Sequence, residues 1–250
     1  VQSLSKENTG SRNVAVGYQA LLQLDYNGEG YNVAVGSNAG ENVSSGVQNT
    51  LIGGLAGDAL TTGQANAALG YRALSSSVDG NHNTAIGCTA LEDYEGGDGE
   101  GHNTAIGSLS QSNATTGEFN TSLGTLAMGV GITTGDHNTV LGYNSGVSLT
   151  SGAENMLIGS FAGDALTSGT RNIAIGYAAL STEDGNGLNT AIGYQALKVQ
   201  NAGANAENVA VGYNAGAAVK TGVQNTIIGG SAGDGISLGA NNVALGYLSL

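Results

Sequence analysis

The chain has 250 residues, of which 44 are glycine and none is proline or tryptophan, and 40% of its residues are hydrophobic. So much glycine indicates disorder or a fibrous repeat, but a disordered chain would carry far fewer apolar residues. The formal net charge of −13 repels nucleic-acid phosphates and anionic lipids, so neither is expected as a partner. No apolar run is long enough to span a bilayer, and the N-terminal residues lack the pattern of a signal peptide.

One short motif repeats along the whole chain. It consists of Asn, a Thr or β-branched residue, a small residue, an aliphatic residue and Gly, and its first copy is Asn13-Val14-Ala15-Val16-Gly17. The Asn recurs at positions 13, 32, 49, 66, 83, 103, 120, 138, 155, 172, 189, 208, 225 and 242, most often 17 residues apart. Such self-similarity is typical of a solenoid. We number the coils 1 to 14 from these Asn residues.

Within each motif apolar character alternates with the period of a β-strand. The residues one and three places after Asn share one face, which we expect to form the core, as at Thr104 and Ile106. The residue between them, usually Ala, is then expected to point outward. Each coil has room for two short strands and two turns, and stacking the coils would pair each strand with its neighbours above and below. The longer coils carry insertions at the second turn, at 26–28 and 95–99.

The repeated Asn and Gly residues have physical explanations. The Gly that follows the aliphatic residue is expected to adopt a φ angle that only Gly reaches cheaply. A second Gly, three residues before most of the Asn residues, marks the other turn. The Asn side chains are expected to stack from coil to coil and to hydrogen-bond with the turn backbone and with each other.

A compensating pattern indicates a packed interior. Eight residues after Asn, six coils carry Leu, as at Leu74, and six others carry Gly, as at Gly57. All six coils with Gly at this place have an apolar residue three positions later, as at Leu60. A constant core volume would require such an exchange.

The strings Asn83-Thr84-Ala85-Ile86-Gly87 and Asn189-Thr190-Ala191-Ile192-Gly193 resemble the head repeats of trimeric autotransporter adhesins and similar repeats of phage or algal-virus tail-fibre proteins. The resemblance covers nearly the whole chain. It implies a left-handed parallel β-roll in which three chains pack side by side and bind a host matrix or receptor. Two departures are the repeat of 17 residues, longer than is typical of adhesin heads, and the absence of the stalk, neck and anchor.

The strip of residues at the middle of each motif has two interpretations. These residues are uncharged: Ala in nine coils, Ser122 in one, and Leu51, Val140, Leu157 and Ile227 in the rest. If the strip faces outward it predicts an interface between copies of the chain. The alternative is that it forms a second wall of the solenoid's own interior.

Several residues are candidate ligands. His82, His102 and His137 each precede a motif Asn and could bind a transition metal, but other residues occupy the same column, which favours solvated histidines. Asp58, Asp164 and Asp234 lie in coils too far apart to share an ion. The acidic stretch 92–100 could hold calcium but lacks the spacing of a calcium loop, which favours a solvated loop.

Tyrosine follows the strand Gly in half of the coils, and these side chains would either bind sugars and protein receptors or cover the solenoid edge. The tyrosines concerned are Tyr18, Tyr71, Tyr143, Tyr177, Tyr194, Tyr213 and Tyr247. No catalytic triad or phosphate-binding pattern is recognisable, and Cys88 stands alone, so no internal disulfide can form. We therefore expect no enzyme activity, no catalytic or metal site and no cofactor.

The sequence thus predicts an all-β fold, a parallel β-solenoid of about 14 coils over residues 1–250, forming one repeat domain that is a segment of a longer chain. The expected function is a structural and adhesive module of an extracellular, cell-surface or virion fibre, whose variable turns in coils 1 and 5 meet a host protein or glycan. The expected partners are copies of the chain, as a homotrimer or stacked end to end. The alternative is a solenoid that binds ice or a polysaccharide.

Overall fold

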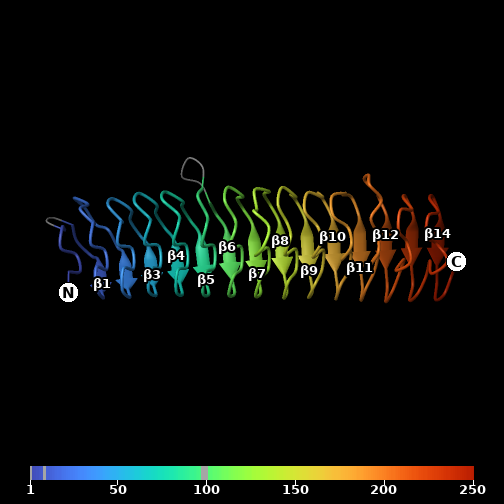
Figure 1. The fold of residues 1–250 in the computed structure, drawn as a ribbon, viewed down its shortest axis with the longest axis horizontal. Helices are drawn as coiled ribbons and strands as arrows, with labels where there is room; N and C mark the ends of the chain where they lie inside the picture. Colours follow the sequence, from blue (N-terminus) through green and yellow to red (C-terminus); the bar gives the residue numbers. More distant parts are fainter. Residues whose placement is uncertain (1, 8–9, 97–100) are drawn as a thin grey trace. The chain divides into compact units, whose positions relative to one another are not determined.

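A computed structural model describes residues 2–7, 10–96 and 101–250 and contains one short strand in each coil (Figure 1). The strands are β1 (Val14–Val16), β2 (Val33–Val35), β3 (Thr50–Ile52), β4 (Ala67–Leu69), β5 (Thr84–Ile86), β6 (Thr104–Ile106), β7 (Thr121–Leu123), β8 (Thr139–Leu141), β9 (Met156–Ile158), β10 (Ile173–Ile175), β11 (Thr190–Ile192), β12 (Val209–Val211), β13 (Thr226–Ile228) and β14 (Val243–Leu245). Among the described residues no helix is long and apolar enough to cross a membrane. The all-β solenoid with a repeat of about 17 residues is confirmed.

The chain forms two compact units, residues 1–125 and 126–250, and each is a parallel β-solenoid. In the first unit β1 to β7 pair in chain order, all parallel and in register, so that Ala34 lies beside Ala15 on one side and Leu51 on the other. In the second unit β8 to β14 pair in the same way. Each coil therefore supplies the strand that satisfies the backbone of the next.

The expectation of two strands per coil is wrong. In the part of the chain that the structure describes, each coil has a single strand of three residues, and turns and bends connect the strands. The cause is a left-handed backbone that recurs at fixed places: in coil 3, φ is +62° at Gln48, +58° at Leu55 and +56° at Gly57. A left-handed residue costs about 1–2 kcal/mol when it is not glycine, so the rest of the structure must hold these residues in place.

Hydrogen bonds between coils hold these turns. The backbone N–H of Leu55 donates to the carbonyl of Ser37 in coil 2 (2.9 Å), and that of Arg72 donates to Gly54 in coil 3 (3.0 Å). Two residues further along, the N–H of Gly57 donates in the opposite direction, to Ala73 in coil 4 (2.9 Å). Coil-to-coil pairing thus continues beyond the strands, which is how a short strand becomes part of a stable stack.

The prediction of which strand face lies in the core is also wrong. The middle residue of each strand from β2 to β14 is buried, with Ala105 and Leu157 completely so, whereas the first and third residues are exposed or half-buried. Ile106 is half-buried on the outer side. The middle residues therefore form a wall of the solenoid's own interior, which is the second of the two interpretations given above.

The interior is narrow, which explains why the middle residue is small. In coil 4 it holds Ala68 from the strand and Leu74 from the opposite turn, both buried. Where Gly replaces this Leu, the apolar residue three places later is buried, as Leu60 is. A Cβ on Gly57 would lie 2.9 Å from Cδ1 of Leu60 and 2.7 Å from Cδ2 of Leu51, so a side chain there would have to displace these leucines. The predicted exchange of core volume is confirmed.

A signal in the sequence identifies the inward face. The four strands whose middle residue is larger than Ala or Ser all belong to coils with Gly eight places after Asn. Their side chains fill the space beside that Gly: the nearest atoms to a Cβ on Gly163 belong to Leu157, and those beside Gly233 belong to Ile227. Two positions that exchange volume must share one interior.

Polar side chains interrupt the apolar core in coils 6 and 7. Gln111 occupies the place of the usual Leu, and its Nε2 donates to the hydroxyl of Ser122 (2.8 Å), which also pairs with Ser110 (2.5 Å). All three are completely buried. The apolar core accordingly forms two clusters, one ending at Ala114 and the other beginning at Ala127.

Candidate interaction surface

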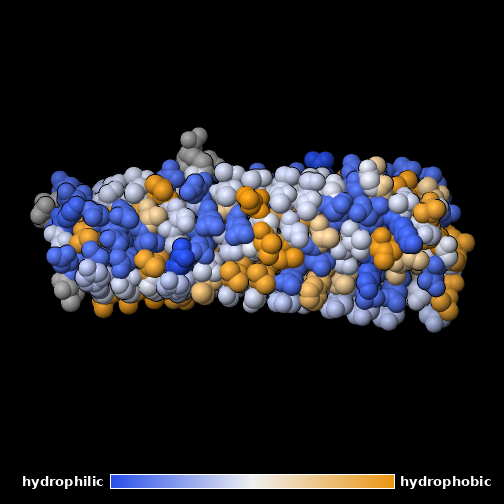
Figure 2. Space-filling view, viewed as in Figure 1, coloured by the Kyte–Doolittle hydropathy of each residue, from blue (hydrophilic) through white to orange (hydrophobic). Residues whose placement is uncertain are grey.

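The outward sides of the strands form the most regular surface in each unit. We call this surface, made of the first and third residues of each strand, the outer face. Its third column contains only Val, Ile and Leu, its first column only Val, Thr, Ala, Ile and Met, and neither contains a charge. Figure 2 shows a row of apolar residues along the lower edge of the part of the molecule nearest the N-terminus, on the side where the strands end.

Aliphatic side chains on the outer face reach solvent although they lie in a sheet. The exposed fraction is 57% for Val16, 47% for Leu69 and 40% for Leu141. The other members of the third column in β2 to β13 also point outward, and they are half-buried or exposed. A contiguous apolar strip of this kind is typical of a surface that another molecule covers.

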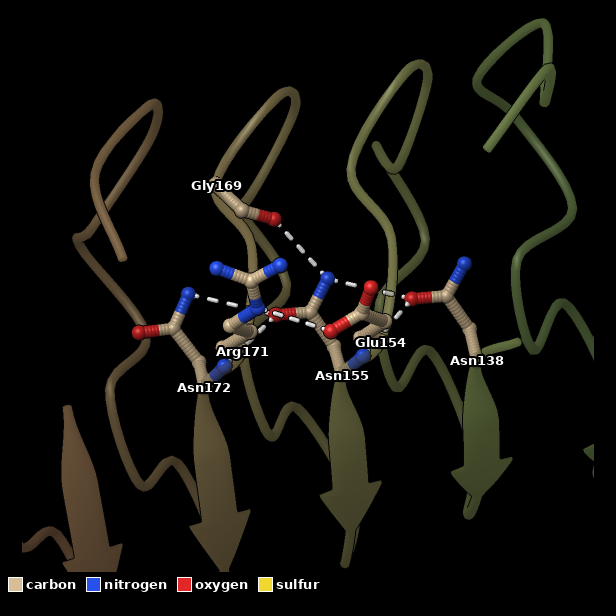
Figure 3. Close-up of polar contacts among 6 residues, drawn as sticks. All are labelled: Asn138, Glu154, Asn155, Gly169, Arg171 and Asn172. Carbon is tan, nitrogen blue, oxygen red and sulfur yellow. Dashed lines mark hydrogen bonds and ion pairs between the residues drawn. The ribbon is translucent and has the colours of Figure 1, made fainter. Parts of the chain in front are cut away.

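A ladder of buried Asn side chains fixes the edge of the outer face at which the strands begin (Figure 3). The side-chain oxygen of Asn138 accepts hydrogen bonds from the backbone N–H and the side-chain amide of Asn155, both 3.0 Å long. The same amide donates to the carbonyl of Gly169 (2.8 Å), and Asn172 repeats the pattern on Asn155. The predicted stacking of the Asn residues is confirmed.

A column of glycines lies at the edge of the outer face where the strands end. Gly53 has a φ of +139°, and a Cβ there would lie 2.3 Å from the carbonyl oxygen of Gly70 in the next coil. Both the predicted φ and a close approach of successive backbones thus require glycine at this place. The Asn ladder and the Gly column hold the outer face in a fixed register between them.

An aromatic column borders the outer face in the second unit. Tyr177, Tyr194 and Tyr213 stack face to face, with ring centroids 5.4 and 5.2 Å apart, and Phe161 contacts Tyr143 and Tyr177 edge to face. All seven predicted tyrosines are 43% exposed or more. Because the stacked rings cover each other's faces, they offer edges and hydroxyl groups to a ligand rather than the flat surfaces on which sugars stack.

The three histidines lie on the surface, as predicted. His82 and His102 are exposed and stack at 4.8 Å, and Phe119 continues the stack at 5.1 Å. His137 is exposed in the second unit. Among the described residues no three metal-binding side chains come together, and no pocket is found.

The acidic candidates are separated or paired. Glu92 forms an ion pair with Arg72 (2.9 Å), and Asp93 and Glu95 are exposed. Asp98 and Glu100, the other carboxylates of the candidate calcium loop, lie outside the described residues.

The repeated aspartates also differ in their surroundings. Burial raises the pKa of Asp58 and of Asp164, while Asp234 is exposed. The exposed Arg171 guanidinium lowers the pKa of Glu154, with which it pairs at 2.7 Å, but exposed pairs of this kind contribute little stability.

The fold and this surface define a parallel β-solenoid repeat protein with an uncharged, partly apolar outer sheet face. Comparison with protein-family models, with curated proteins and with solved structures finds no match. The resemblance to adhesin heads and tail-fibre repeats therefore rests on the repeated motif alone.

Sequence reasoning missed the outer face because it assigned those residues to the core. The sequence did show that the first and third residues of each strand share one face, and the aliphatic third residue is present in every coil. The link between a large middle residue and Gly eight places after Asn was the signal that separates the two faces.

Proposed function

We propose that this chain is a structural and adhesive module of an extracellular or virion fibre, without enzyme activity, in which the outer faces of three copies pack together. The observation that carries the proposal is the uncharged aliphatic column that repeats in every coil of the outer face. A fully solvated sheet face would carry charged side chains instead.

Packing the outer faces together would contribute favourable free energy to an assembly. Covering an aliphatic side chain that is about half exposed contributes about 1 kcal/mol. The six third-column residues that are 40% exposed or more would then contribute on the order of 5 kcal/mol per copy, before the costs of association. The resemblance to adhesin heads favours three copies, and the turns away from the outer face remain free to meet a receptor.

The mass of the assembly in solution tests the proposal. Sedimentation equilibrium should give three times the chain mass of 24.6 kDa. Ile52→Glu, which places a charge in the third column of β3, should give single chains that retain their β-sheet circular dichroism. The matched control is Thr62→Glu in an exposed turn of the same coil, which should leave the assembly intact. A wild-type chain that stays single at high micromolar concentration would rule the proposal out.

Cys88 offers a second readout, because it is exposed and follows the strand Gly of coil 5 beside the outer face. Pulsed dipolar EPR of a spin label on this single cysteine should give one distance, with the modulation depth of three coupled spins. A depth corresponding to two spins would indicate a dimer and would contradict the threefold arrangement.

The binding of ice remains the second candidate, because the structure places threonines on the outer face. Thr84, Thr104 and Thr121 lie in the first column of successive strands. Seven of the fourteen first-column residues are not threonine, Ala67 and Met156 among them, which favours packing between chains over an ordered lattice of water. Thermal hysteresis of the wild-type chain that is lost in Ile52→Glu would support this candidate against the fibre module.

A further inference from the structure

Tyrosines of three successive coils stack on the surface of the second unit. Tyr177, Tyr194 and Tyr213 each follow the strand Gly, in coils 10, 11 and 12, and we call them the tyrosine stack. The planes of successive rings are nearly parallel, 13° and 10° apart, and the centroids are separated by 5.4 and 5.2 Å. All three residues are exposed. The stack therefore presents the edges and hydroxyl groups of three adjacent phenols to solvent.

The backbone fixes the spacing of these rings. The N–H of Gln195 donates to the carbonyl of Tyr177 in the coil before it (2.8 Å). A Cβ on Gly193, one residue before Tyr194, would lie 2.2 Å from the carbonyl oxygen of Gly212, so the coils approach closely just where the tyrosines begin. Since successive strands lie about 4.8 Å apart, each ring keeps its neighbour as long as the coils stay stacked.

The run of three is particular to these coils. The four other tyrosines that follow a strand Gly, Tyr18, Tyr71, Tyr143 and Tyr247, have no tyrosine at the equivalent place of a neighbouring coil. Between Tyr143 and Tyr177 lies the ring of Phe161, which contacts both edge to face. The other four tyrosines therefore serve as internal controls for any reaction that needs two adjacent phenols.

We propose that the tyrosine stack is a site of oxidative cross-linking, at which a haem peroxidase with hydrogen peroxide joins neighbouring rings into dityrosine and so fastens adjacent coils covalently. Each phenol gives one electron to the oxidised haem and its hydroxyl proton to solvent. The two phenoxyl radicals then form one carbon–carbon bond between ring carbons (Cε) that lie next to the hydroxyl groups. The hydrogen on each bonded carbon leaves as a proton, and each ring oxygen takes one up. Two phenols and one hydrogen peroxide thus give one linked pair and two waters.

The geometry favours coupling within one chain. Two reactants that are held beside each other react far more readily than two that must first meet in solution. Tyr194 has a neighbour on both sides, so it can be joined to either Tyr177 or Tyr213. Bond formation requires the two rings to turn until their edges meet, and their exposed sides leave room for this motion. The three tyrosines lie outside the outer face, so the reaction does not require the threefold assembly.

The cross-link would strengthen the stack where it forms. A bond between tyrosines of successive coils closes a loop of one coil, which restrains the unfolded chain and leaves the folded coils in place. The cross-linked chain should therefore unfold at a higher urea concentration than the unmodified chain.

Peroxidase treatment of the whole chain tests the proposal. With Cys88 alkylated, a limiting amount of hydrogen peroxide should produce dityrosine fluorescence in a species that runs as a single chain on a denaturing gel. Trypsin then distinguishes the two links, because it cuts after Arg171, Lys198 and Lys220. A link from Tyr194 to Tyr213 joins peptides 172–198 and 199–220, whereas a link to Tyr177 makes peptide 172–198 lighter by two hydrogens.

Variants separate the stack from the other tyrosines. Tyr194→Phe leaves no adjacent pair of phenols, so it should lower the yield of dityrosine within single chains by about fivefold or more. Tyr71→Phe is the matched control, because it removes an exposed tyrosine whose neighbouring coils carry Gly54 and Cys88 at that place. Its yield should equal that of the wild type.

Three results would overturn the proposal. The first is a wild-type map in which links are spread over all the tyrosines or occur only between chains. The second is a yield that Tyr194→Phe leaves unchanged. The third is a cross-linked chain with the same urea midpoint as the unmodified chain, which would show that the bond does not fasten the coils. The wild-type map decides the matter even if a variant fails to fold.

Discussion

At the scale of single residues, the solenoid depends on two side-chain types that no other residue replaces. Asn supplies both a donor and an acceptor to the neighbouring coils, and Gly allows two backbones to approach more closely than a Cβ permits. The stacking of the Asn side chains and the φ angle of the Gly could be predicted from the sequence, because residues kept in fourteen copies have few physical explanations. The close approach of the backbones at the Gly could not, because it depends on the distance between coils.

Loss of one Asn from the ladder should cost much more than loss of a surface Asn. Asn155→Ala leaves the N–H of Asn172 and the carbonyl of Gly169 buried without partners, so we expect a loss of about 3 kcal/mol in the free energy of unfolding. Asn42→Ala, at an exposed turn, should cost about 0.5 kcal/mol or less. Urea denaturation of the two variants makes the comparison, and equal losses would show that the ladder contributes nothing special.

Two glycines with positive φ separate the effect of backbone strain from that of close approach. A Cβ on Gly193 would lie 2.2 Å from the carbonyl oxygen of Gly212, whereas Gly203 has a φ of +70° and open space around it. Gly203→Ala should cost about 1–2 kcal/mol through strain alone. Gly193→Ala should cost at least about 3 kcal/mol, since the coils must move apart. Thermal melts that show similar costs would mean that the coils adapt to the extra atom.

At the scale of the coil, the sequence predicted the existence and spacing of the strands but not their number per coil or their orientation. A period-two pattern defines two faces without showing which is inside. The more apolar face was assigned to the core, although in this chain it lies outside and the inner face carries Ala. Left-handed residues such as Leu55 and Leu74, which replace the second strand, also give no sequence signal, because many of them are neither glycine nor asparagine.

The exchange of volume within a coil predicts how core substitutions combine. Gly57→Leu alone should cost about 3 kcal/mol by overpacking against Leu51 and Leu60, and Leu51→Ala alone about 3 kcal/mol by leaving a cavity. When these two changes are combined with Leu60→Ser, the interior should be refilled. The triple variant should then cost at least about 2 kcal/mol less than the sum of the single changes.

Coil 4 is the template for that combination, because it carries Ala68, Leu74 and Ser77 at the equivalent places, all buried. Urea denaturation of the single, double and triple variants gives the coupling energy. Strictly additive costs would contradict the claim that the three positions share one space.

At the scale of the whole molecule, the repeat turns a strand too short to be stable into a stack that satisfies its backbone on both sides. The sequence allowed the class of fold to be predicted because this repetition is visible without knowledge of any side-chain direction. The burial of Glu183 could not be predicted in this way, because it follows from a column that only the coordinates reveal.

The central claim is that the middle residue of each strand faces the interior and the third residue faces outward. The most direct measurement compares Ala105→Glu with Ile106→Glu by circular dichroism during thermal melting. We predict that Ala105→Glu, which buries a charge in a space the size of a methyl group, abolishes the cooperative melt of the first unit. Ile106→Glu should retain the β-sheet spectrum and a cooperative melt. The reverse result, with Ala105→Glu folded and Ile106→Glu unfolded, would contradict the account.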